Sequence, residues 1–71
     1  MQEELINIVA KALEIAPEEI AVEDNLMVVG LHSLALMTIT EQIAQRYNRP
    51  VSFAALMQNP TIQAWEQLLN S

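Results

Sequence analysis

Apolar residues recur every three or four positions in several segments of this chain, and polar residues fill the positions between them. In residues 3–15 this recurrence lays an apolar stripe along one side of a helix. The stripe consists of Leu5, Val9, Ala12, Leu13 and Ala16. Glu3 and Glu4 suit the positive end of the helix dipole, and Pro17 marks the exit because the residue before a proline is pushed out of helical geometry. We therefore expect a first helix over residues 3–15.

A second amphipathic segment extends from about Ser33 to Tyr47. Its core stripe should contain Leu36, Ile39 (or Thr40), Ile43 and Tyr47, with Ala35 and Ala44 beside it. Arg46 suits the negative end of the dipole, and Pro50 stops the helix soon afterwards. The pattern predicts a second helix over residues 33–47.

Two further helices are expected near the end of the chain. Ser52 has the position of a cap for a short helix over residues 53–57. Asn59, Pro60 and Thr61 then begin a last helix, with capping residues and a proline in its first turn. The last helix should end near Asn70, and its buried face should consist of Ile62, Trp65, Leu68 and Leu69.

A long connection, residues 17–32, joins the first two helices. Structureless loops of this length are uncommon in compact domains and are usually functional. Its apolar members should pin it onto the core, and they are Ile20, Val22, Leu26, Met27 and Val29. Residues 17–20 are expected to form a brief helical turn. Val28 and Val29 suggest a strand, but no partner strand is visible elsewhere in the sequence.

The predicted fold is all-α: a small four-helix bundle with three main helices, one short helix and a long first connection. A chain of 71 residues is near the lower limit for one hydrophobic core, so we expect a single domain over residues 1–71. There is no cysteine, so neither a disulfide nor a thiolate metal site supplements that core. The sequence is either a free-standing protein or a trimmed domain of a larger one.

Nine acidic residues against three basic ones give a formal charge of −6, which argues against nucleic acid and anionic lipid as partners. The charge indicates either partners with basic docking surfaces or simply a role in keeping a small apolar domain in solution. Four of the acids cluster in the connection: Glu18, Glu19, Glu23 and Asp24. They lack the pattern of a calcium loop and one histidine makes no zinc site, so we interpret them as a solvated acidic face and expect no metal.

The longest apolar run, residues 26–31, is too short to span a membrane. The first four residues include two glutamates and no basic residue, where a signal peptide would be basic, so we expect a cytoplasmic location.

Ser33 is the main candidate for chemistry. Gly30 frees the backbone just before it, and a helix is predicted to begin at the serine, where the dipole and the first amides would favour an added phosphate. The alternative is that Ser33 only caps the helix. Catalysis by His32 and Ser33 together is not expected, because nothing marks an orienting carboxylate or an oxyanion hole.

Leu34 and Met37 lie off the apolar stripe of the second helix. Both are therefore expected to be partly exposed beside Ser33, and Thr38 continues the same face. Methionine suits a surface that must accept differently shaped partners. The alternative is that a small bundle wraps apolar residues around much of this helix.

The segment Gly30-Leu31-His32-Ser33-Leu34 resembles the 4′-phosphopantetheine attachment motif of carrier proteins. Residues 24–34 are similar to the attachment region of the peptidyl and aryl carriers of nonribosomal peptide synthesis, and residues 51–56 and 59–65 resemble later helices of aryl carriers from siderophore-type pathways. His32 replaces the aspartate of acyl carriers, which weakens the case for fatty acid synthesis. Val28 stands where many relatives carry an acidic residue.

The resemblance implies that Ser33 carries the phosphopantetheine arm and that Gly30 and His32 belong to the flanking motif. It also implies a docking centre at Leu34, Met37 and Thr38, with two residues at its edge, which are Leu31 and Phe53. The implied carrier is a non-catalytic monomer that holds an amino or aryl acid as a thioester.

Its partners would be a phosphopantetheinyl transferase, an adenylation enzyme and a condensation or other synthetase domain. An acyl carrier of polyketide or fatty acid synthesis and an unmodified interaction module remain alternatives.

Overall fold

The computed structural model describes residues 1–70, which form five α-helices and one 3₁₀ turn. The elements are α1 (Gln2–Leu13), η1 (Pro17–Glu19), α2 (Leu26–Val29), α3 (Ser33–Tyr47), α4 (Phe53–Gln58) and α5 (Ile62–Asn70). No strand occurs among these residues, so the all-α prediction with three main helices is confirmed.

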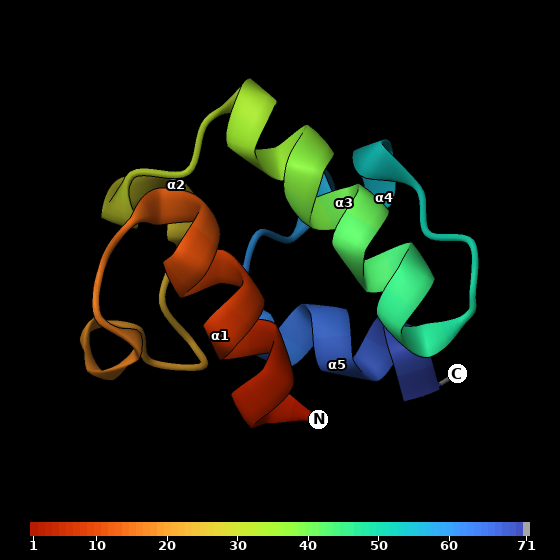
Figure 1. Ribbon diagram of the computed structural model, residues 1–71, viewed down its shortest axis with the longest axis horizontal. Helices are drawn as coiled ribbons and strands as arrows, with labels where there is room; N and C mark the ends of the chain where they lie inside the picture. The colour runs from red at the N-terminus through yellow and green to blue at the C-terminus, as the bar shows by residue number, and fades with distance from the viewer. Residues whose placement is uncertain (71) are drawn as a thin grey trace.

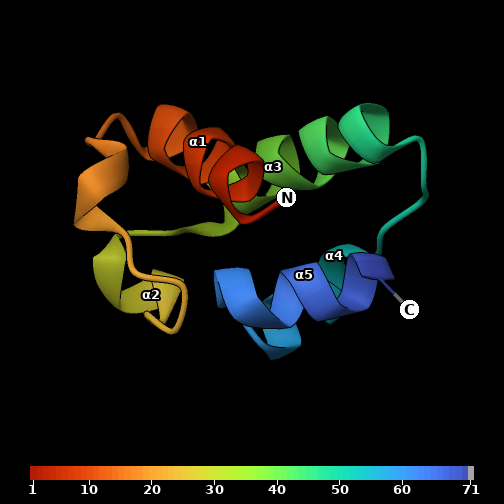
Figure 2. The ribbon, with the colours of Figure 1, turned by 90° about the horizontal axis from the view of Figure 1, so that it is seen from below.

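The helices lie in two layers. Figure 2 shows α1 and α3 in one layer and α4 and α5 in the other, with α2 at one end of the molecule. Helix α1 packs on both α3 and α5, and α4 packs on α3. In Figure 1 the connection between α1 and α3 passes around the left side, so the start of α3 lies at the upper edge.

One hydrophobic core lies between the layers. Its largest fully buried side chains are Trp65, Leu5, Leu26, Leu36, Ile39, Ile43, Leu56, Ile62 and Val9. Burial of each large apolar side chain contributes roughly 1.5–3 kcal/mol. The indole N–H of Trp65 donates a hydrogen bond to the Leu56 carbonyl at 3.1 Å, which joins α5 to α4 inside the core. The predicted stripe of α3 is confirmed for Leu36, Ile39 and Ile43.

Helix α1 ends two residues before the predicted end. Glu14 adopts a left-handed conformation at φ 58°, and the amides of Glu14 and Ile15 bond back to the carbonyls of Lys11 and Ala10. This arrangement is a Schellman motif, which satisfies the last carbonyls of the helix before Pro17 is reached. As a consequence, Ala16 is exposed and lies outside the core.

A short helix, α2, occupies the part of the connection for which Val28 and Val29 suggested a strand. The Asn25 side chain accepts a hydrogen bond from the Met27 amide at 2.9 Å and caps this helix, and Gly30 ends it. Met27 is 43% exposed, so the expectation that it pins the connection to the core is wrong. Residues 17–19 do form the expected helical turn.

The connection is tied to the start of α5 by two backbone hydrogen bonds. The Leu26 amide donates to the Pro60 carbonyl at 2.8 Å, and the Gln63 amide donates to the Val22 carbonyl at 3.0 Å. Helix α5 begins at Ile62, so Pro60 lies before it and not in its first turn as predicted. Thr61 caps α5 by accepting from the Ala64 amide at 3.1 Å.

Helices α4 and α5 differ from the sequence predictions in small ways. Ser52 caps α4 as predicted, with the Ala55 amide donating to its hydroxyl at 3.3 Å, and α4 continues one residue further than expected. Leu68 is exposed at 37% and does not belong to the buried face of α5.

Across residues 1–70, no helix combines the length and the apolar character that crossing a membrane requires.

Candidate functional site

Ser33 is the first residue of α3, the helix whose start lies at the upper edge of the molecule in Figure 1. Its side chain is exposed, and within residues 1–70 its hydroxyl makes no hydrogen bond. The amides of Ser33 and Leu34 lie in the first turn, where a helix provides no carbonyl partner for them. An unbonded hydroxyl therefore lies beside donors that favour an anion.

His32, and not Ser33, caps α3. His32 has extended backbone geometry at φ −136° and ψ 172°, and its Nδ1 accepts a long hydrogen bond from the Ala35 amide at 3.4 Å. The alternative that Ser33 serves only as the cap is thus wrong, because the cap lies one residue earlier. The imidazole Nδ1 is directed to the Ala35 amide.

Gly30 makes the turn that leads to the serine. It has φ +132°, a conformation that side-chain-bearing residues rarely adopt, and its amide donates to the Leu26 carbonyl at 3.1 Å as α2 ends. The next amide, of Leu31, donates to the same carbonyl at 2.9 Å. The turn therefore fixes the direction in which the chain leaves α2 towards Ser33.

Leu31 anchors this segment in the core. Its side chain is only 4% exposed, so it is unavailable to a partner and the expectation that it forms the edge of a docking surface is wrong. The burial of Leu31 fixes the chain two positions before Ser33, whereas His32 and Ser33 stay exposed.

Helix α3 carries no acidic residue in its first turn, so no carboxylate there opposes an anion at Ser33. Arg46, the basic residue in its last turn, lies about 20 Å along the helix axis from Ser33. The helix supplies the local electrostatics at Ser33 through its amides and its dipole, and not through Arg46.

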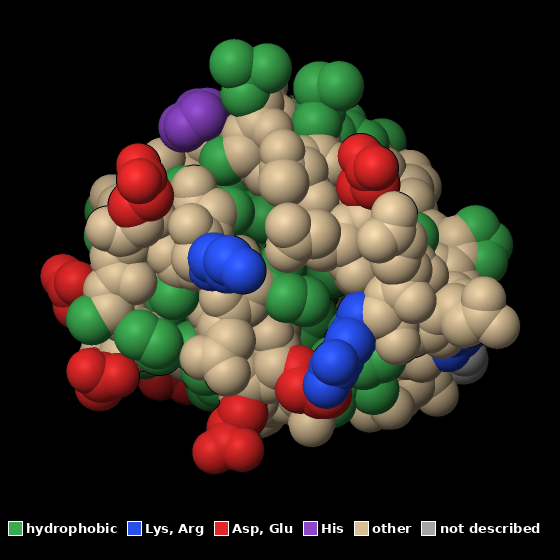
Figure 3. Space-filling view, in the orientation of Figure 1, with side chains coloured by type: hydrophobic (Ala, Val, Ile, Leu, Met, Phe, Trp, Pro, Cys, Tyr) green, Lys and Arg blue, Asp and Glu red, His purple; other side chains and the backbone are tan. Residues whose placement is uncertain are grey.

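Exposed apolar side chains flank Ser33 on α3. Leu34 is 72% exposed and Met37 is 58% exposed, so the alternative that both are wrapped into the core is wrong. Thr38 is also exposed, and its hydroxyl donates to the Leu34 carbonyl at 3.4 Å. Phe53 is half-buried and packs against the core. Figure 3 shows apolar side chains beside the single histidine at this edge.

A second exposed apolar pair, which the residue pattern did not predict, lies on α2. Val28 is 84% exposed and Met27 is 43% exposed, whereas Leu26 of the same helix is fully buried. A signal for this helix is present in the sequence, since Asn25 and Gly30 have the composition of a cap and a terminator around four apolar residues.

Two of the four acidic residues of the connection accept hydrogen bonds from backbone amides. Glu19 accepts a hydrogen bond from the Ala16 amide, and Asp24 accepts one from the Ala21 amide, both at 3.0 Å. Within the part of the chain that the structure describes, no three acidic, histidine or cysteine side chains are grouped to hold a metal ion.

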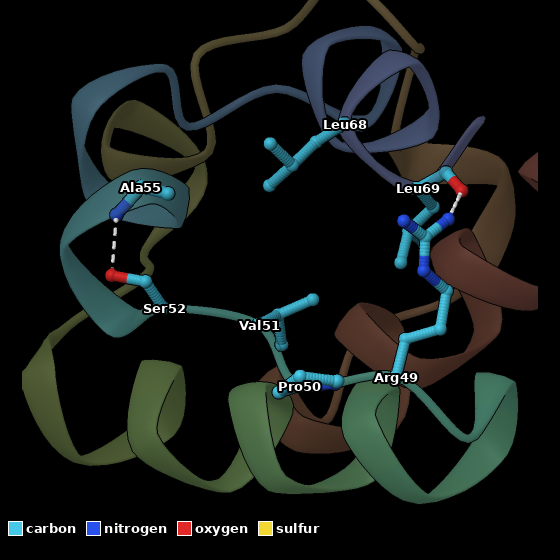
Figure 4. A pocket seen from close by; sticks show the side chains of 7 residues that line it. All are labelled: Arg49, Pro50, Val51, Ser52, Ala55, Leu68 and Leu69. Carbon is cyan, nitrogen blue, oxygen red and sulfur yellow. Dashed lines mark hydrogen bonds between the residues drawn. The ribbon is translucent and has the colours of Figure 1, made fainter. Parts of the chain in front are cut away.

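A cavity of about 230 Å³ lies elsewhere, between the segment that follows α3 and helix α5 (Figure 4). Its lining residues are Arg49, Pro50, Val51, Ser52, Ala55, Leu68 and Leu69. The Arg49 guanidinium donates to the Leu69 carbonyl at its rim. None of the residues predicted for the site lines this cavity.

A charged cluster joins α1 to the end of α3. Arg46 pairs with Glu4, and the Tyr47 hydroxyl donates to the other Glu4 oxygen at 3.1 Å. The hydrogen bonds from Arg46 and Tyr47 lower the pKa of Glu4 from its ordinary value of 4.5. Burial and the hydrogen bond to Glu4 raise the pKa of Tyr47.

The sequence and the fold both match known proteins. The model of the family described as "Phosphopantetheine attachment site" matches residues 3–69. A chain in the structure of the phosphopantetheine transferase Sfp in complex with coenzyme A and a peptidyl carrier protein superposes with a TM-score of 0.90. It is 26% identical, and the match covers 97% of this chain and 87% of that one.

A second solved structure, McyG A-PCP complexed with phenylalanyl-adenylate, gives a TM-score of 0.89 at 24% identity. This match covers 96% of this chain and 10% of that one, and it supports the fold alone.

Two curated relatives are much longer than this chain. An isochorismatase of Bacillus subtilis (strain 168) is 36% identical over 63 residues, which are 89% of this chain and 20% of that protein. The vanchrobactin synthetase VabF of Vibrio anguillarum is 30% identical over 69 residues, which are 97% of this chain and 2% of that protein.

Proposed function

This chain belongs to the phosphopantetheine attachment site family, and from that membership we propose that it is a carrier protein whose Ser33 bears a 4′-phosphopantetheine arm. The observation that carries the proposal is the exposed Ser33 hydroxyl, unbonded within residues 1–70, at the first residue of α3. Ser33 also lies within the matched residues 3–69.

The residues around Ser33 fit a covalently attached phosphate. The first amides and the positive end of α3 would stabilise a phosphodiester on the hydroxyl, and no acidic side chain lies in that turn. Gly30 and His32 would hold the backbone on which the serine is presented. When attached, the arm supplies a thiol that holds an acyl group as a thioester.

We assign the cargo to the amino or aryl acids of nonribosomal peptide or siderophore-like synthesis. This assignment is supported by the likeness to a segment of vanchrobactin synthetase and by the superposition with a peptidyl carrier protein complex. Arm attachment calls for a phosphopantetheinyl transferase, and loading calls for an adenylation enzyme. A condensation or other synthetase domain would take the cargo onward.

The proposed carrier is a single, non-catalytic domain and a monomer. Leu34, Met37 and Thr38 would form the centre of its docking surface, with Phe53 at the edge. The proposal places it in the cytoplasm, the compartment that supplies coenzyme A to a transferase and ATP to an adenylation enzyme.

The test is intact mass after incubation with coenzyme A, magnesium and a broad-specificity phosphopantetheinyl transferase. We expect a gain of one phosphopantetheine in the wild type and none in Ser33→Ala. A wild type that is shown to be folded and gains no mass would overturn the proposal and favour an unmodified interaction module.

The modified protein would then be offered to adenylation enzymes for amino acids and for aryl acids, and to an acyl-activating enzyme as comparison. Loading by the acyl-activating enzyme alone would contradict the assigned cargo and favour polyketide or fatty acid synthesis.

A further inference from the structure

The start of α3 has two residues that could cap it, and the chain uses the less common type. Serine is among the preferred capping residues, since its hydroxyl accepts a hydrogen bond from an amide of the first turn. Here the acceptor is Nδ1 of His32, bonded to the Ala35 amide, and the Leu36 amide bonds to the His32 carbonyl at 2.9 Å. Helix α3 therefore begins at Ser33 and not after it.

This arrangement leaves the serine oxygen uncommitted. A capping serine has helical residues only after it, and its hydroxyl oxygen is engaged by the amide two or three residues further on. If the helix began one residue later, the Ser33 hydroxyl would face the Leu36 amide in that way. As the structure stands, the hydroxyl is exposed and has no hydrogen bond within residues 1–70.

We propose that His32 is a positioning residue for arm attachment: by capping α3 through Nδ1, it keeps the nucleophilic hydroxyl of Ser33 out of the cap. The inference rests on the proposed function, in which Ser33 receives the arm. Without an acceptor at position 32, the orphan amides of the first turn take the nearest side-chain oxygen, which is that of Ser33. Leu31, buried in the core, limits how far the backbone can move to avoid this exchange.

The role assigned to His32 requires an acceptor and not an imidazole as such. An Nδ1 that accepts is the unprotonated nitrogen of a neutral ring whose proton is on Nε2. Asparagine is a good capping residue and carries an uncharged oxygen acceptor, so His32→Asn keeps the function of the cap while removing the ring. His32→Ala removes both, which makes the two substitutions a matched pair.

The experiment measures steady-state arm transfer onto the wild type, His32→Ala and His32→Asn, with the carrier as the varied substrate. We expect kcat to fall about fivefold in His32→Ala, the factor by which one cap favours its own helix start. We expect KM to change little, because Leu34 and Met37 stay exposed on α3. His32→Asn should restore kcat to the wild-type range.

A second readout needs no transferase. The ¹³Cα and ¹³Cβ NMR shifts of Ser33 distinguish a first helical residue from an extended capping residue. We expect helical shifts in the wild type and in His32→Asn, and extended shifts in His32→Ala. The same spectra show whether each variant is folded.

The outcomes separate this inference from the proposed function. An unmodified wild type overturns the proposed function, and the Ser33 shifts still report which residue caps α3. A modified wild type with equal kcat in His32→Ala overturns the positioning role, whatever the shifts. Slow transfer in both variants, with helical Ser33 shifts, also overturns it, since the transferase would then need the imidazole itself.

Discussion

Leu34 and Leu36 lie two positions apart on α3 and have opposite environments: Leu34 is 72% exposed, and Leu36 is fully buried. The two side chains are chemically identical and belong to one helix. Substituting each in turn therefore distinguishes the effect of an exposed leucine from that of a buried one. Leu36 closes the space between α3 and the rest of the core, whereas Leu34 extends from the turn that contains Ser33.

We expect Leu34→Ala to leave the free energy of unfolding within about 0.5 kcal/mol of the wild type, as for other surface substitutions. It should raise the KM of the transferase or of the adenylation enzyme for the carrier, because Leu34 belongs to the proposed docking surface. Leu36→Ala, the matched control, should cost about 2–5 kcal/mol through the cavity that it leaves. Urea unfolding and carrier-dependent kinetics measure the two effects, and unchanged KM in both Leu34→Ala and Met37→Ala would remove these residues from the docking surface.

Ser33→Ala should abolish arm attachment at almost no cost in stability. A capping serine would cost about 1 kcal/mol when replaced by alanine. Ser33 is instead the first helical residue, and the cap is His32, so the substitution removes no hydrogen bond within the part of the chain that the structure describes. Urea unfolding of Ser33→Ala should match the wild type within about 0.5 kcal/mol. A loss near that of a removed cap would show that Ser33 and not His32 caps α3 in solution.

Gly30→Ala should destabilise the protein even though nothing lies within 4 Å of the position that a Cβ would take. The cost comes from the backbone, because φ +132° is unfavourable for alanine. We expect a loss of about 1–3 kcal/mol in the free energy of unfolding. Val28→Ala, on the highly exposed position of α2, is the control and should fall within about 0.5 kcal/mol of the wild type. Equal free energies of unfolding for the two variants would mean that the turn at residue 30 can relax to accept alanine.

The cluster around Glu4 predicts a pH dependence of stability. Hydrogen bonds from Arg46 and Tyr47 lower the pKa of Glu4 in the folded state below its ordinary value of 4.5. Its contribution to stability is therefore complete above that ordinary pKa and is lost as the pH falls through the folded pKa. Glu4→Gln should be less stable than the wild type at neutral pH, and the difference should shrink below pH 4.5. Urea midpoints measured across that range provide the check, and a difference that is independent of pH would contradict this assignment.

The sequence pattern placed the start of α3 at Ser33 and offered this serine as a possible cap, whereas the cap is His32. Serine before an apolar helical pattern is the usual sign of a cap, and histidine is not. His32 is the cap because the turn at Gly30 and the buried Leu31 place its imidazole over the Ala35 amide. That placement depends on contacts with α2 and the core, which no local pattern of residues contains.

The structure of the second half of the connection also could not be predicted from local residues. Four apolar residues at positions 26–29 allow a strand or a helical turn, and their periodicity is too short to decide. Helix α2 forms where the Leu26 amide bonds to the Pro60 carbonyl and the Leu26 side chain enters the core. The Pro60 carbonyl and most of the core residues come from distant parts of the chain. With Leu26 held by them, Met27 and Val28 lie on the surface.

The residue pattern alone predicts an all-helical fold, a helix from Ser33 to Tyr47, and the burial of Leu36, Ile39 and Ile43. These features follow from the 3.6-residue period and from local capping and proline signals, which act within a few residues. Three features do not follow from any local pattern and come from the packing of distant segments: His32 caps α3, Leu31 is buried and Leu68 is exposed. Burial and the partner of an orphan amide depend on which segments meet in space, and that is set by the packing of the two layers.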